Sequence, residues 1–213
     1  MSGKRILFTI ALMLPIAFAQ QASAQSPNVP KYDGNKLIFP DGFRTSWQFV
    51  GSNMGLQYKG ESATPLKNGH PVTGAPGPQN AFHNVYITPE GYAGFRASKT
   101  AFPDPTILVI DIYSADKKEP HHILSAGFFD GDQEGALVAV KDSTHPQGSG
   151  PDKSIWSYYV FAAADIAKPG ASAAPPPPNV EAACIACHKK NGLVDNVWVQ
   201  FYPMLRDLLK SPN

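Results

Sequence analysis

Short apolar segments, separated by glycine, proline, aspartate or asparagine, recur through the middle of the chain. Five of them are rich in Val, Ile and aromatic residues, a composition typical of β-strands. Apolar and polar residues alternate in Ile110-Asp111-Ile112-Tyr113, which indicates a sheet with one drier face. The spacing is that of hairpins. We predict an antiparallel sheet with strands at residues 47–54, 83–88, 107–114, 136–143 and 156–161.

Helical patterns are fewer. Residues 89–98 are predicted to form a helix, because Thr88 can cap it and Pro89 suits its first turn. A second helix is predicted after residue 188, broken or restarted at Pro203. The chain has 21 prolines and 18 glycines in 213 residues, which favours short elements and frequent turns. We therefore predict an α+β fold, a mainly antiparallel β-sheet of about five strands with a few helices.

The N-terminus has the features of a secretory signal peptide. Lys4 and Arg5 precede an apolar run at residues 6–19, and Ala22-Ser23-Ala24 supplies small residues for cleavage. The run is shorter than the roughly 20 apolar residues that a permanent span needs. We predict a signal peptide at residues 1–24, export to the periplasm and no permanent membrane span.

Charge argues against nucleic acid as a partner. The formal net charge is +1, and loss of Lys4 and Arg5 takes the 18 basic residues to 16 against 17 acidic ones. No basic stripe is present that would attract phosphates.

The candidate chemistry lies near the C-terminus. Residues 184–188 read Cys-Ile-Ala-Cys-His, the C-x-x-C-H motif of c-type haem attachment. Cys184 and Cys187 are spaced to bond covalently to one haem, and His188 then serves as axial iron ligand. A redox disulfide or half of a zinc site would also use C-x-x-C. Zinc usually needs a second ligand pair, and no second C-x-x-C exists. A redox dithiol should follow a buried strand, whereas here a proline-rich stretch precedes the motif.

The motif divides the mature chain into three parts. Residues 25–167 are expected to form the antiparallel β domain and the distal haem pocket. Residues 168–180 form a proline-rich connector that includes four consecutive prolines, which favour an extended polyproline conformation. Residues 181–213 contain the haem-attachment segment and a C-terminal helix. Residues 61–80, with several prolines and glycines, are expected to form a surface loop.

No strong sixth iron ligand is evident in the sequence. Only 25 residues follow His188, so Met204 is poorly placed to reach the far side of the haem. Met54 and the other histidines are weak alternatives, His83 being the strongest of the set His70, His83, His121, His122 and His145. An iron with one protein ligand is suited to binding a small molecule. We predict an open distal position.

Several blocks of the sequence together resemble the cytochrome P-460 family. They are Phe-Pro-Asp-Gly-Phe-Arg at 39–44 with Trp47, Phe-Pro-Asp at 102–104, Trp-Ser-Tyr-Tyr-Val-Phe at 156–161, Cys-Ile-Ala-Cys-His-Lys-Lys at 184–190 and Asp-Asn-Val-Trp-Val-Gln-Phe-Tyr-Pro at 195–203. The resemblance implies a mainly antiparallel β fold, one C-terminal haem c and a homodimer. Members that oxidise hydroxylamine carry a lysine–haem cross-link. The related cytochromes c′-β lack it, cap the iron with aromatic rings and bind nitric oxide.

The resemblance implies candidate residues for both kinds. Lys99 is the candidate cross-linking lysine, with Lys141 a weaker one, and Pro105 departs from the glycine common after Pro-Asp in the family. Phe43, Phe95 and Phe102 fall in the segments expected to face the haem. A catalytic acid or base could be Asp142, Asp152 or Glu134, and the sequence does not choose among them. The expected functions are binding or handling of nitric oxide or related small nitrogen compounds, or hydroxylamine oxidation with a soluble redox partner. Simple electron transfer is the third alternative function.

Overall fold

A computed structural model of the chain describes residues 28–55, 66–67, 70–71, 81–116, 123, 125–147 and 154–211. The signal peptide expected at residues 1–24 lies outside the described residues, as do His121, His122 and Asp152. Of the loop expected at residues 61–80, the structure describes two short paired strands, β4 (Leu66–Lys67) and β5 (His70–Pro71).

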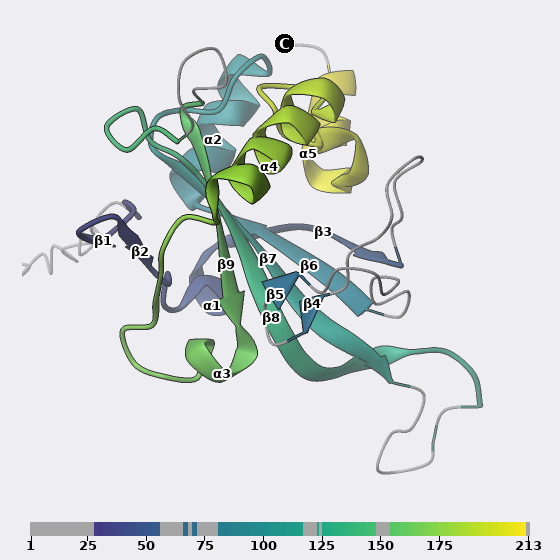
Figure 1. Ribbon diagram of the computed structural model, residues 1–213. Helices are drawn as coiled ribbons and strands as arrows, with labels where there is room; N and C mark the ends of the chain where they lie inside the picture. The colour runs from purple at the N-terminus through teal and green to yellow at the C-terminus, as the bar shows by residue number, and fades with distance from the viewer. Residues whose placement is uncertain are drawn as a thin grey trace, which may run out of the picture.

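The main element is a five-stranded antiparallel sheet (Figure 1), which confirms the predicted fold class. Its strand order is β3-β6-β7-β8-β9, so each strand beyond the first pair lies beside its predecessor in the chain. Each predicted strand is present, and β7 and β8 are longer than expected. The strands are β3 (Gln48–Met54), β6 (Ala81–Ile87), β7 (Thr106–Asp116), β8 (Phe129–Lys141) and β9 (Trp156–Ala162).

A smaller sheet joins the N-terminal part of the described chain to the proline-rich connector. It consists of β1 (Tyr32–Asp33), β2 (Lys36–Ile38) and β10 (Ser172–Ala173), with β2 in the centre. The connector ends in helix α4 (Pro178–Asn191), with a proline in its first turn. A proline is tolerated there because the first N–H groups of a helix have no intrahelical acceptor.

The remaining helices are short. Helix α2 (Pro89–Ser98) has the predicted bounds, and Thr88 caps it by accepting a hydrogen bond from the Gly91 N–H at 3.3 Å. Helix α5 (Pro203–Lys210) begins at the predicted restart, preceded by a 3₁₀ turn, η2 (Val199–Phe201). Helices α1 (Phe43–Ser46) and α3 (Ala163–Ile166) are single turns. Among the described residues, none of the helices has the length and apolar character to traverse a lipid bilayer.

The sheet separates two hydrophobic clusters because side chains alternate between its faces. Leu108 and Tyr158 face the helices, and α2, α4 and α5 gather at this end of the sheet (Figure 1). We call this the helix face. Val109 and Tyr159, the next residues along, point to the other side, where they pack with α1 and the small sheet. The C-x-x-C-H motif therefore lies over one defined face of the sheet.

Candidate functional site

Helix α4 carries the C-x-x-C-H motif and is anchored to the helix face by Ile185, which is fully buried. Cys184, Cys187 and His188 are three and four positions apart, the spacings that place side chains on one side of a helix. Neither of these two cysteines forms a disulfide in the described part of the chain, and both are partly buried. Burial raises the pKa of the Cys184 thiol, and the neighbouring Cys187 adds to that effect. Cys184 is therefore a protonated thiol at neutral pH.

A backbone carbonyl holds the His188 imidazole. The Nδ1 atom lies 2.9 Å from the Asn196 carbonyl oxygen. A carbonyl oxygen can only accept, so Nδ1 carries the proton and Nε2 keeps its lone pair. Burial lowers the pKa of His188, and the hydrogen bond to Asn196 opposes this effect in part. The ring is therefore neutral, with Nε2 available to a metal, as iron ligation requires.

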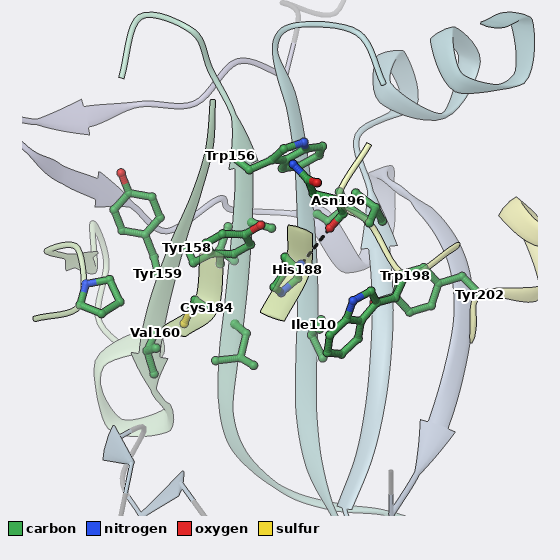
Figure 2. Close-up of a pocket in the computed structure, with 16 residues that line it drawn as sticks. Ile110, Trp156, Tyr158, Tyr159, Val160, Cys184, His188, Asn196, Trp198 and Tyr202 are labelled. Atoms are coloured by element: carbon green, nitrogen blue, oxygen red, sulfur yellow. Dashed lines mark hydrogen bonds between the residues drawn. The ribbon is translucent and has the colours of Figure 1, made fainter. Parts of the chain in front are cut away.

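Two aromatic rings flank this imidazole (Figure 2). Trp198 stacks on it with ring centroids 4.9 Å apart and planes inclined by 10°. Tyr158, from β9, lies on the other side at 4.3 Å with a tilt of 35°. Burial raises the pKa of Tyr158 well above its usual value, with a smaller contribution from Cys184, so the phenol stays neutral. The ring of His188 is thus fixed by packing as well as by its hydrogen bond.

A cavity opens beside Cys184 and His188 and is lined mostly by apolar side chains (Figure 2). It contains about 670 Å³ of space free of protein atoms, part of it continuous with solvent. Its lining consists of Leu108, Ile110, Leu137, Val138, Ala139, Trp156, Tyr158, Tyr159, Val160, Pro176, Cys184, His188, Asn196, Val197, Trp198 and Tyr202.

These features fit a haem. The donor set contains a neutral imidazole with a free Nε2 and a thiol that opens onto the same cavity. The lining is mostly apolar, as a porphyrin face requires, and Leu108 and Ile110 of the sheet form part of one wall. Cys187, unlike Cys184 and His188, does not line the cavity, and its sulfur receives a hydrogen bond from the Asn191 amide at 3.4 Å.

The turn that presents the Asn196 carbonyl is itself held by an ion pair. The Lys141 ammonium at the end of β8 donates to Asp195 Oδ2 at 2.7 Å and to the Phe102 carbonyl oxygen at 2.7 Å. Asp195 Oδ2 also accepts from the Phe102 N–H at 3.0 Å. Lys141, the weaker candidate for a cross-link, is thus engaged with Asp195 at the rim of the site.

Lys99 lies apart from the cavity. It ends α2 in the left-handed conformation, with φ of 57°, and its ammonium donates to the Ser211 carbonyl oxygen at 2.7 Å. Its side chain does not contribute to the cavity lining.

The three candidate phenylalanines separate into two groups. Phe95 and Phe102 stack with ring centroids 4.4 Å apart in the cluster that also contains Ile185 and Tyr158. They lie behind the cavity wall, where Phe102 meets Trp156 edge-on at 5.9 Å. Phe43 packs in the cluster on the opposite face of the sheet. This placement gives no support to a role for Phe43 above the iron.

The remaining candidates within the described residues also lie outside the cavity lining. Met54 and Met204 are exposed. His145 pairs with Asp142 at 3.1 Å in a loop. His83 differs from these residues because it is largely buried in the sheet, and this burial lowers its pKa. Glu134 lies on β8, and burial raises its pKa, with a further contribution from Asp116.

Comparison with known families adds an independent observation. The family model described as Cytochrome P460 matches residues 40–199, which include the main sheet, the motif and the turn beyond it. The chain belongs to the cytochrome P460 family. Membership implies haem binding and suggests a haem c cytochrome. Comparison with curated proteins gives no match.

Sequence reasoning missed much of what surrounds the cytochrome P460 motif. Tyr158 could have been inferred, because Trp156, Tyr158 and Val160 alternate on one strand and share a face. Asp195-Asn196 is a dipeptide that tolerates positive φ, which is a turn signal rather than the helical start we expected. The partnership of Lys141 with Asp195 has no local signal, since 54 residues separate them.

Proposed function

We propose that this chain is a periplasmic mono-haem c-type cytochrome that binds or handles nitric oxide or related small nitrogen compounds. Cys184 and Cys187 would attach the haem covalently, and His188 would ligate the iron through Nε2. The observation that carries the proposal is the His188 Nδ1 hydrogen bond to the Asn196 carbonyl, at the wall of an apolar cavity that Cys184 also lines.

When bound, the haem would supply an iron able to coordinate a small ligand, and His188 would hold that iron. The chain's own residues orient the imidazole and keep the cavity apolar. Tyr158 and Trp198 restrict rotation of the imidazole, and Leu108 and Ile110 give one wall of the cavity an apolar surface. An apolar wall favours neutral diatomic ligands over anions, because it offers no hydrogen bonds to a charge. This preference supports nitric oxide as the ligand class.

Hydroxylamine oxidation with a lysine–haem cross-link is the second candidate. It would require Lys99 or Lys141 to reach the haem. Lys99 donates to the Ser211 carbonyl oxygen, and Lys141 is engaged with Asp195. We therefore rank nitric oxide binding first. We also propose a homodimer and, for the oxidase alternative, a soluble redox partner.

Absorption spectroscopy of the haem-loaded protein tests this ranking. We expect a ferric form without a second strong protein ligand, and a ferrous form that binds nitric oxide readily. Besides His188 and Cys184, which haem attachment would use, the described lining offers the phenols of Tyr158, Tyr159 and Tyr202 as donors. Burial raises the pKa of all three phenols, which keeps them protonated and poor iron ligands. A low-spin, six-coordinate ferric form with a protein ligand would contradict the open position. A haem peptide joined to a peptide containing Lys99 would instead favour the oxidase, and the Lys99→Ala variant should then lack it.

A further inference from the structure

The ion pair between Lys141 and Asp195 is enclosed by the protein. Its side chains are 9% and 16% exposed, whereas those of the surface pair Lys168–Asp165 are 69% and 53% exposed at a similar N–O distance. An enclosed pair is screened little by solvent, and loss of one partner leaves the other charge uncompensated. The position of Asp195 is therefore strongly coupled to the presence of Lys141.

Asp195 belongs to a tight turn whose geometry needs external support. Val194 and Val197 form an antiparallel bridge, and the two residues between them have positive φ, 50° at Asp195 and 62° at Asn196. Positive φ at both central positions is characteristic of a type I′ turn. Residues other than glycine adopt it at a cost, which the surrounding contacts must offset. Lys141, the Phe102 N–H and the Trp156 indole, 3.5 Å from Oδ1, all bind the Asp195 carboxylate.

The same turn reaches the imidazole through its backbone. Asn196, the residue next to Asp195, offers its carbonyl oxygen to His188 Nδ1 at 2.9 Å. Gly192 allows the turn to come this close to α4. A Cβ placed on Gly192 would lie 2.4 Å from the Asn196 carbonyl carbon and 2.7 Å from the His188 oxygen, so only glycine fits without displacement.

We infer that Lys141 and Asp195 are positioning residues for the haem ligand, and that the contact they maintain between the Asn196 carbonyl and His188 sets the reduction potential of the iron. The inference rests on the proposed haem function. A hydrogen bond from Nδ1–H to a carbonyl increases electron donation by the imidazole to the metal. Stronger donation stabilises ferric iron and lowers the potential. Release of the turn should weaken donation and raise the potential.

The test compares haem-loaded variants by potentiometry and by the iron–histidine stretching frequency. In Lys141→Met, we expect a higher reduction potential and a lower stretching frequency, with the ratio of haem to protein unchanged. Asp195→Asn should shift both in the same direction, because it removes the charge that Lys141 holds and keeps the side-chain shape. Lys141→Arg, which keeps the charge, should return both readings towards those of the wild type.

Lys168→Met is the matched control, because it breaks an ion pair of similar length on the surface. It should leave the potential and the stretching frequency unchanged. If Lys141→Met does not fold, Asp195→Asn and Gly192→Ala carry the test, the latter by pushing the turn away from α4. A potential and a stretching frequency that stay at wild-type values in these haem-loaded variants would overturn the inference. Failure of the wild-type protein to acquire haem would instead overturn the proposed function.

Discussion

At the scale of single residues, the site depends on which nitrogen of His188 carries the proton. The Asn196 carbonyl fixes that proton on Nδ1, and the flanking rings of Tyr158 and Trp198 fix the plane of the imidazole. A ligand held in this way is oriented before any metal binds. The acceptor is a backbone carbonyl, which has one protonation state at every relevant pH. The orientation of the imidazole therefore does not depend on the titration of a neighbouring side chain.

His83 provides a residue-scale prediction on pH. Burial lowers its pKa from the usual 6.5, so the unfolded chain binds a proton more readily than the folded one. Stability should therefore be fully present above pH 6.5 and fall as the pH drops below it towards the folded pKa. We expect the free energy of unfolding to decrease from about pH 7.5 to about pH 5.5 by less in His83→Gln than in the wild type.

Guanidinium unfolding at the two pH values measures this difference. Comparing His83→Gln with the wild type cancels the titrations that are common to both proteins, because the two differ only in this imidazole. Equal losses of stability in the two proteins would show that His83 titrates alike in the folded and unfolded states.

At the scale of elements, α5 holds the C-terminal segment against the helix face of the sheet. Leu205 is fully buried there, and its neighbour Met204 is 42% exposed. Leu205→Ala should lower the free energy of unfolding by about 2–5 kcal/mol, because it removes buried methyl groups and leaves a cavity. Met204→Ala should change it by no more than about 0.5 kcal/mol. Chemical denaturation of both variants checks the contrast, and equal effects would mean that α5 does not pack as described.

The elements also show which features the sequence could predict. Helix α2 was predicted with its bounds, because Thr88 and Pro89 are local signals that act within one turn. All five main strands were predicted from composition and alternation. Phe43 was expected near the haem, yet it packs on the opposite face. Alternation separates the two faces of a strand but does not say which face a distant helix will cover, so that choice depends on the tertiary structure.

At the scale of the whole molecule, one sheet keeps two hydrophobic clusters apart and assigns the motif to one of them. The C-x-x-C-H sequence predicted the thiols and the imidazole of the site, but not its surroundings. Asn196 and the Lys141–Asp195 pair come together through contacts that span the chain. Such contacts leave no periodic pattern in the sequence. The family match over residues 40–199 includes the sheet residues that line the cavity and most of the C-terminal ones. This agrees with a site built from the sheet and the C-terminal segment together.

The central claim is that a single haem is bonded covalently to Cys184 and Cys187. It is tested most directly by the intact mass of the protein in a denaturing solvent, after production in a host able to mature c-type cytochromes. We predict the mass of the mature polypeptide plus one haem, located by digestion on the peptide containing both cysteines, and the bare polypeptide for the Cys184→Ala/Cys187→Ala double variant. A wild-type protein with the mass of the bare polypeptide would contradict the account.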